Sequence, residues 1–306
     1  GLFLYLALHK LDWIAFISSL RNANYEYIPI IFIWGSINSW IRALRWRVLL
    51  TTEKEIPAKH VFWANMAGYL GNNILPARAG EFIRAAYVSR ENNISGPFSL
   101  TTGLIERFID LVALVILGSI SLSNSGILSK PLQDALRAMA TIAGMGIITL
   151  LLLPYFGDKI FKILKALPLL TESVKDKISG LLKQFLRGAE SLHHPKRALA
   201  FILFTSIIWM MDGIGTIILA RTLHLDFTLT QSFLLIAALG LSSAIPSTPG
   251  YVGVYQFVAV VVLQPFGISN ANALAFIVFL QILNLLTLSF WGGIAIWRSP
   301  FRAQKK

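Results

Sequence analysis

The chain has 306 residues, of which 55% are hydrophobic and 14% are charged, and its mean hydropathy is +0.65. Soluble domains carry about 25% charged residues, so this composition excludes most soluble classes. The net charge is +12, but in so apolar a chain we interpret the basic residues as a membrane-topology signal and not as a nucleic-acid-binding surface. The absence of cysteine excludes disulfides, a thiol nucleophile and thiolate metal sites.

Long apolar blocks predict an all-α, polytopic membrane protein that forms one domain over residues 1–306. Residues 1–8 are expected to be the end of a first span whose start precedes Gly1. Residues 12–27 are expected to lie at the interface, anchored by aromatic side chains. Further spans, for a total of about six, are predicted at 28–50, 98–122, 136–155, 198–223 and 271–297.

Two other apolar segments, 58–90 and 228–264, are interrupted by proline and glycine. Proline removes a backbone donor, so each break leaves unpaired backbone groups at membrane depth. Such groups are tolerated only where protein or a water-filled cavity covers them. We therefore predict two re-entrant or broken helical hairpins, whose breaks contain Pro76, Gly80, Pro246, Pro249, Gly250 and Gly253.

The two breaks are related by a constant offset. Pro246 follows Pro76 by 170 positions, and Gly250 follows Gly80 by the same number. The flanking spans recur at a similar offset, and an odd number of spans separates the starts of the two units. We therefore predict inverted repeats over 28–122 and 198–297, an arrangement that in transporters places the central site at the breaks.

Basic residues are concentrated in the 157–197 segment and in the C-terminal tail. The positive-inside rule places both in the cytoplasm, and the alternation of spans places the N-terminus there too, in a protein of the cell membrane. Residues 157–197 alternate apolar and basic side chains. This pattern is typical of an amphipathic helix on an anionic inner leaflet, or of a plain linker between the repeats.

Charged side chains inside the apolar segments are the candidate site. An ionisable group in the bilayer costs several kcal/mol, so it should face a cavity or a partner. Asp212 lies in the middle of the 198–223 span, and Glu106 and Asp110 are one helical turn apart in the 98–122 span. The full set is Arg78, Glu81, Arg84, Glu106, Arg107, Asp110 and Asp212, with Asn72, Asn73, Gln256 and Asn284 as weaker candidates.

We expect Arg78 or Arg84 to bind a lipid phosphate, because a guanidinium engages two oxygens at once. The carboxylates would position that arginine or receive a cationic or sugar headgroup, and Asp212 would be a proton-linked acid. The alternative is that pairs such as Arg78 with Glu106, or Arg107 with Glu81, only lock the helices together. The amides would more often form interhelical hydrogen bonds.

Three motifs occur in order: Asn73-x-x-Pro76-x-Arg78-x-Gly80-Glu81, Glu106-Arg107-x-x-Asp110 and Pro246-x-x-Pro249-Gly250-x-x-Gly253. In these motifs and in hydropathy the chain resembles the lysylphosphatidylglycerol synthase transmembrane (flippase-like) family, the membrane portion of the multiple peptide resistance factor. The resemblance implies a lipid-flippase fold whose polar residues line the lipid path. In the synthase a soluble aminoacyl-transfer domain follows; this sequence ends at Lys306, so we expect none here. Gln256 stands where the family often has glutamate, which puts in doubt a mechanism with a second-hairpin carboxylate and a preference for a lysyl headgroup.

The sequence thus predicts a lipid flippase, without a cofactor or metal site, and not an enzyme. The expected partners are an anionic or aminoacylated phospholipid, or a polyprenyl-phosphate sugar, together with anionic lipids of the inner leaflet and no nucleic acid. The motifs GxSxG, HExxH and GxxxxGK[ST] do not occur. A membrane-embedded lipid-modifying transferase and an ion or small-solute secondary transporter remain the alternatives.

Overall fold

The computed structural model describes residues 2–8, 11–75, 79–126, 171–243 and 249–300, with isolated residues between 134 and 162. The predicted span at 136–155 and the first part of the 157–197 linker lie largely outside the described residues, and Pro76, Arg78 and Pro246 lie wholly outside them. Over the described residues all regular structure is helical, which confirms the all-α prediction. The longer helices are α1 Leu2–Leu8, α2 Trp13–Arg21, α3 Ile28–Leu50, α4 Ala58–Ile74, α5 Gly80–Asn92, α6 Gly96–Ser123, α9 Glu172–Glu190, α10 Pro195–Thr222, α11 Leu229–Ser242, α12 Val254–Leu263 and α13 Asn270–Trp297.

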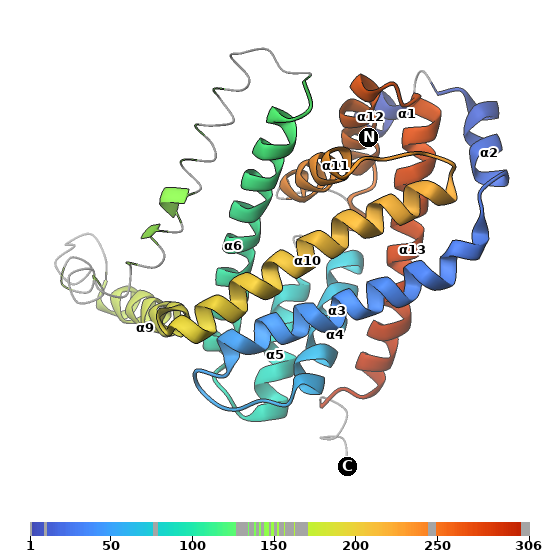
Figure 1. The fold of residues 1–306 in the computed structure, drawn as a ribbon. Coiled ribbons are helices and arrows are strands. Elements are labelled where there is room, and N and C mark those ends of the chain that lie inside the picture. The colour runs from blue at the N-terminus through green and yellow to red at the C-terminus, as the bar shows by residue number, and fades with distance from the viewer. Residues whose placement is uncertain are drawn as a thin grey trace.

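The long helices form the frame of the protein. Helices α3 and α10 lie side by side and run antiparallel, while α6 and α13 run upright in opposite directions (Figure 1). Helices α4 and α5 pack against each other, and so do α11 and α12. Each pair contacts both upright helices: α5 lies on α6 and α4 on α13, whereas α12 lies on α13 and α11 on α6. This reciprocal pattern is the one that an inverted two-fold repeat would produce.

Glycine residues shape both interrupted segments. A Cβ on Gly80 would overlap the carbonyl oxygen of Gly68, so α5 can start this close to α4 only without a side chain. In the second segment, Gly250 and Gly253 have φ of 68° and 92°, a region that favours glycine. The predicted helix–break–helix order is thus present in both segments, and re-entry into the membrane stays a prediction.

Only two described helices, α10 and α13, are long and apolar enough to cross a membrane by composition. Helices α3 and α6 begin and end within a few residues of the predicted spans, and each carries three charged side chains. Every 18-residue stretch of α6 contains Glu106, Arg107 and Asp110, because these residues lie near its middle. The side chains that make up the candidate site therefore also lower the hydropathy of the helices that carry them.

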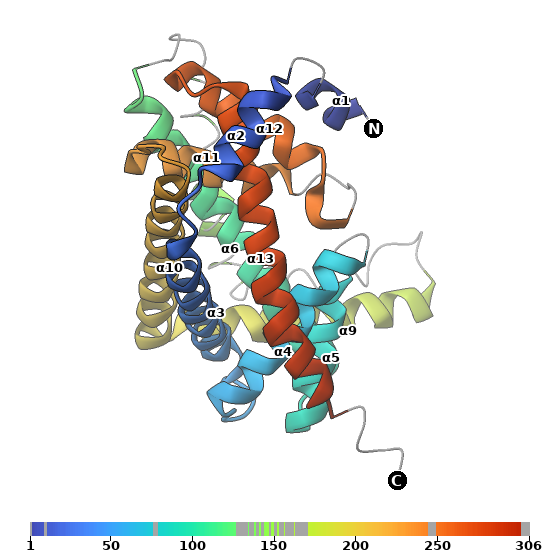
Figure 2. The ribbon, with the colours of Figure 1, turned by 90° about the vertical axis from the view of Figure 1, so that its right-hand side faces the viewer.

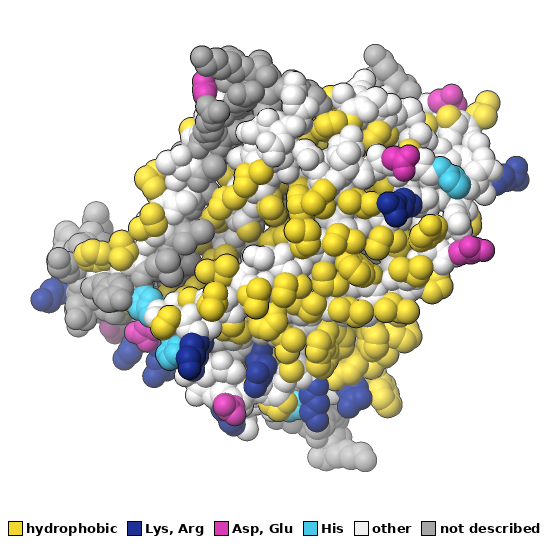
Figure 3. All heavy atoms as spheres, in the orientation of Figure 1, with side chains coloured by type: hydrophobic (Ala, Val, Ile, Leu, Met, Phe, Trp, Pro, Cys, Tyr) yellow, Lys and Arg dark blue, Asp and Glu magenta, His cyan; other side chains and the backbone are white. Residues whose placement is uncertain are grey.

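One face of the protein carries a broad apolar surface. In Figure 3, hydrophobic side chains gather over α3 and α10, whereas Lys and Arg side chains are most frequent near the end of α3 and the start of α10. On α3, Ile30, Ile33 and Ile37 are exposed, as are Leu199, Ile202 and Leu203 on α10. A contiguous exposed apolar surface of this kind is expected where a protein contacts lipid.

The predicted topology can be tested with single cysteines, because the chain has none of its own. Asn124 follows α6 at one end of the molecule and Gly180 lies in α9 near the other (Figure 1), and both are exposed. We expect an impermeant thiol reagent to label Asn124→Cys in intact cells, and Gly180→Cys only after permeabilisation, since the positive-inside rule predicts that the basic end faces the cytoplasm. The reverse pattern would overturn the topology.

Candidate functional site

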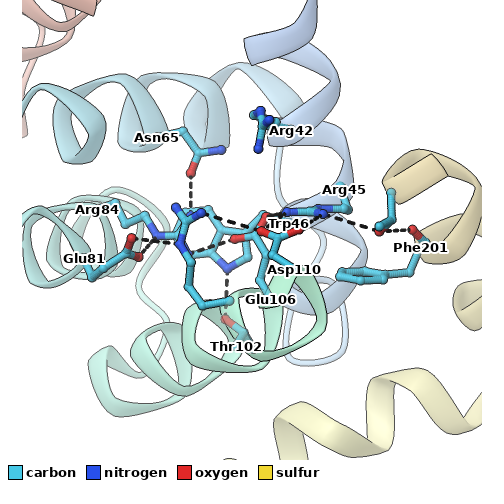
Figure 4. A network of polar contacts seen from close by, with 12 residues as sticks. Arg42, Arg45, Trp46, Asn65, Glu81, Arg84, Thr102, Glu106, Asp110 and Phe201 are labelled. Carbon is cyan, nitrogen blue, oxygen red and sulfur yellow. Dashed lines mark hydrogen bonds and ion pairs between the residues drawn. The ribbon is translucent and has the colours of Figure 1, made fainter. Parts of the chain in front are cut away.

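Arg45 of α3 belongs to a buried polar network (Figure 4). Its Nη2 lies 2.9 Å from Glu106 Oε1, and its Nη1 and Nη2 lie 2.6 and 2.9 Å from the two oxygens of Asp110. Glu106 and Asp110 are one turn apart on α6, so both carboxylates face α3. Arg45 is completely buried, and its charge is therefore balanced by protein groups alone.

Arg84 of α5 is likewise buried and paired with carboxylates. Its Nε lies 2.7 Å from Glu81 Oε2, its Nη2 lies 2.8 Å from Glu106 Oε2, and its Nη1 donates to the amide oxygen of Asn65 at 3.3 Å. The ring of Trp46 lies 4.4 Å from its Cζ. Gly103 makes room for the guanidinium, since a Cβ there would lie 2.8 Å from Nη2. Arg84, an expected phosphate ligand, thus has no solvent-facing side.

Arg107 of α6 closes the network. Its Nε lies 3.0 Å from Glu81 Oε1, and its Nη1 lies 3.6 Å from Asp110 Oδ2. The ion pairs now form a closed ring in which positive and negative groups alternate. We call this set the charge ring, and in order around it stand Arg45, Glu106, Arg84, Glu81, Arg107 and Asp110. The ring has three arginines and three carboxylates, so its formal charge is zero.

A second ion pair joins α3 to α10. Arg42 Nη2 lies 2.5 Å from Asp212 Oδ2, and Asn38 Nδ2 donates to Asp212 Oδ1 at 2.5 Å. The Arg42 guanidinium also lies 5.7 Å from the ring centre of Trp209. Asp212 follows Arg42 by 170 positions, the offset that relates the two predicted breaks. The pair therefore joins equivalent positions of the two predicted repeats.

A cavity of about 430 Å³ lies between the helices that carry these groups. Four charged side chains line it, Arg42 and Asp212 from the second pair and Glu81 and Arg107 from the charge ring. Both interrupted segments contribute to its wall, and so do α3, α10 and α13. The other polar and aromatic lining residues are Trp34, Asn38, Ser39, Tyr69, Asn72, Asn73, Trp209, Thr216, Tyr251, Tyr255, Asn284 and Thr287.

Four buried polar atoms of the cavity wall have no hydrogen-bond partner among the described residues: Asn38 Oδ1, Tyr69 Oη, Asn72 Oδ1 and Trp209 Nε1. The amide groups of Asn38 and Asn72 are oriented by donation to Asp212 and Glu81, so their carbonyl oxygens remain as acceptors. An unpaired buried polar group costs about 1–3 kcal/mol, so native structures rarely retain one. The wall is therefore suited to a polar ligand that both donates and accepts hydrogen bonds.

The structure brings most of the predicted site residues together. Five of them belong to the charge ring, while Asp212, Asn73, Asn72 and Asn284 line the cavity. Gln256 lies elsewhere: it accepts from the Gly253 amide at 2.7 Å and donates to Gln281 at 2.6 Å, so it caps α12. Arg78 lies outside the described residues. No cluster of three or more His, Asp and Glu side chains within the described part of the chain could hold a metal ion.

Sequence reasoning missed Arg42 and Arg45 as site residues. Both lie with Arg47 near the end of the predicted 28–50 span, where basic residues ordinarily mark the cytoplasmic side of a membrane. The available signal was their spacing, because residues three or four apart share a helix face, as Arg42 with Arg45 and Glu106 with Asp110 do. Asn38 and Trp209 were also missed, and nothing in their sequence context distinguishes them from ordinary span residues.

A model of the lysylphosphatidylglycerol synthase transmembrane region matches residues 1–292. The glycosyltransferase AglD of Haloferax volcanii is 23% identical over 279 residues, which cover 78% of this chain and 43% of AglD. A UPF0104 membrane protein of Methanocaldococcus jannaschii is 25% identical over 229 residues, which cover 74% of this chain and 92% of that protein. A second UPF0104 membrane protein of the same organism is 31% identical over 97 residues, covering 31% of this chain and 29% of that protein. No solved structure matches the chain.

The charge ring predicts that substitution of one of its members lowers stability far more than substitution of an exposed charged residue. We expect Arg45→Ala to lower the free energy of unfolding by about 3–5 kcal/mol, because it leaves Glu106 and Asp110 buried beside an empty space. The exposed Lys59 of α4 is the control, and Lys59→Ala should change stability by no more than about 0.5 kcal/mol. The measurement is thermal or denaturant unfolding of the purified protein in detergent. Equal stability of the two variants would show that the ring does not hold the helices.

Proposed function

The chain belongs to the lysylphosphatidylglycerol synthase transmembrane family, and from this membership and the cavity we propose that it is a lipid translocase. In this proposal a phosphate-bearing lipid crosses between leaflets with its headgroup in the cavity. The observation that carries the proposal is that two arginines reach the cavity, each held there by a carboxylate that also lines it. A family of membrane proteins is the setting in which such a cavity meets lipid headgroups.

We assign phosphate binding to Arg42 and Arg107. Their side chains are 18% and 24% exposed, against 0% and 1% for Arg45 and Arg84. A planar guanidinium can present two parallel N–H groups to phosphate oxygens, but only if part of its edge is accessible. Arg45 and Arg84 would then position the helices, and Arg78 stays a predicted ligand at the first break.

The carboxylates give the site a way to release its ligand. A phosphate that binds Arg42 or Arg107 competes with Asp212 or Glu81 for the same guanidinium. One ion pair replaces another, so the net gain in free energy is small and the lipid is not trapped. The carboxylate that is freed can take a cationic group of the headgroup, and Asp212 can instead take a proton.

The unpaired acceptors narrow the choice of headgroup. The carbonyl oxygens of Asn38 and Asn72 need a donor from the ligand, which phosphate oxygens cannot supply. We therefore propose a headgroup that carries hydroxyl or ammonium groups beside its phosphate. Phosphatidylglycerol, its aminoacylated forms and polyprenyl-phosphate sugars share this chemistry.

One comparison favours a second candidate, a lipid-modifying transferase, because a relative is named a glycosyltransferase. This chain covers less than half of that relative, and a transferase would also need a donor substrate beside the lipid. The two candidates differ in a simple observable. A translocase returns its lipid chemically unchanged in the other leaflet, whereas a transferase changes its mass.

The proposal is tested by leaflet exchange in proteoliposomes that hold fluorescent phosphatidylglycerol, aminoacyl-phosphatidylglycerol or polyprenyl-phosphate-sugar probes. We expect exchange above protein-free vesicles with at least one probe. Arg107→Gln and Arg42→Gln should each slow it by about tenfold or more, since a hydrogen bond to a charged group contributes about 1.5–3 kcal/mol. Arg47→Gln is the matched control, because Arg47 lies on the same helix as Arg42 but bonds to the Ile56 carbonyl and not to the cavity.

Three results would contradict the proposal. No exchange with any probe, with and without a pH gradient, would favour the solute-transporter alternative. A change in probe mass would favour the transferase. Unchanged exchange in both arginine variants would contradict the assignment of phosphate binding to Arg42 and Arg107.

A further inference from the structure

We propose that a second, apolar site between α3 and α13 holds an acyl chain of the lipid while its headgroup lies in the cavity. The inference rests on the proposed function and names the path by which the lipid enters. The site is a groove of about 310 Å³, and we call it the α3–α13 groove. Its wall consists of Ile28, Pro29, Phe32, Ile33, Leu283, Leu286 and Thr287.

The groove offers nothing to a polar ligand. Thr287 is the one residue of its wall with a polar side chain, and that hydroxyl donates to the carbonyl oxygen of Leu283 at 2.9 Å. Ile33 and Leu286, on opposite sides of the groove, are each 57% exposed. Their neighbours Ile30 and Phe290 are exposed as well. In a membrane protein this surface faces hydrocarbon, and lipid tails are as apolar as the wall.

The groove adjoins the cavity. Leu283 and Thr287 line both, so the two spaces share the wall that α13 provides. On α3, Gly35 lines the cavity, and a Cβ there would lie 3.9 Å from Thr287 Cγ2. A charged polar space and an apolar space in contact match the two parts of one amphiphile. An extended peptide segment is a poor occupant, because its backbone N–H and C=O groups would find no partner in the groove.

Aromatic contacts bound the groove at both ends. The rings of Tyr25 and Phe279 meet at 5.9 Å at one end, and Phe32 of the groove wall meets Phe290 at 5.5 Å at the other. Trp291 Nε1 also donates to Ser36 Oγ at 2.8 Å. Figure 2 shows α13 running along this side of the molecule, from α2 past α3. The two helices thus touch at both ends of the groove and are separated between them. We call this opening the lateral window, through which a lipid could enter the cavity from the membrane.

A reversible cross-link tests the window. Gly35→Cys with Thr287→Cys joins α3 to α13, since a Cβ on Gly35 would lie 3.9 Å from Cγ2 of Thr287, which is one bond from the Cβ that would carry the second thiol. The chain has no other cysteine, so the pair is unambiguous. Each comparison is made within the double variant: we expect oxidation to lower its exchange to the rate of protein-free vesicles, and reduction to return it to the rate that the variant had before oxidation.

The control pair is Gly118→Cys with Ala237→Cys, which joins α6 to α11, where a Cβ on Gly118 would lie 3.0 Å from that of Ala237. The oxidised control should keep its exchange. Loss of exchange in both oxidised pairs would overturn the inference, because rigidity alone would then explain the effect.

A second variant needs no oxidation. Ile33→Trp should fill the groove and slow exchange, whereas Ile30→Trp should not, since Ile30 is similarly exposed on the same helix but lies outside the groove wall. If the unaltered protein exchanges lipid, and the oxidised double variant and Ile33→Trp exchange it equally fast, the groove is overturned and the proposed function stands. A lack of exchange in the unaltered protein would overturn the proposed function and the groove with it.

Discussion

A charge among apolar helices is tolerated only when other charges surround it, and this constraint organises the whole protein. The charge ring satisfies it for three arginines at once, because each arginine contacts two carboxylates and each carboxylate contacts two arginines. The ring joins α3, α5 and α6. It thereby fixes α5 against the long helices, and Glu81 in the first turn of α5 is placed at the cavity wall as a consequence.

Helix locking and ligand binding need not be alternative roles for these charges. Exposure divides the arginines into two groups: Arg45 and Arg84 are buried, whereas Arg42 and Arg107 border the cavity. A sealed pair has nothing to exchange with and serves the fold. A pair at the cavity can exchange its partner for a ligand group, provided that the sealed pairs hold the helices meanwhile. Arginine–carboxylate pairs can therefore lock helices where they are buried and bind a ligand where they border the cavity.

Many of the helices and most members of the charge ring can be predicted from the sequence. The helices predicted at 28–50 and 271–297 are confirmed to within one residue, because long apolar runs and the Ser269 cap mark their ends. The ring members on α5 and α6 stand out as charges within apolar segments. Arg45 does not, since a basic residue near the end of a span ordinarily marks the cytoplasmic side. The capping role of Gln256 depends on Gln281, a tertiary neighbour that no local pattern indicates.

A neutral cavity suits the movement of a charged amphiphile better than a positive one would. An excess of arginine would hold an anionic lipid in a deep energy minimum, whereas two arginines already paired with carboxylates only exchange partners. The adjoining apolar groove adds a second argument. An ion would need neither the groove nor so wide a cavity, and a soluble solute would not need the groove. A polar and an apolar space that share the wall formed by Leu283 and Thr287 fit a molecule with both characters, which is a lipid.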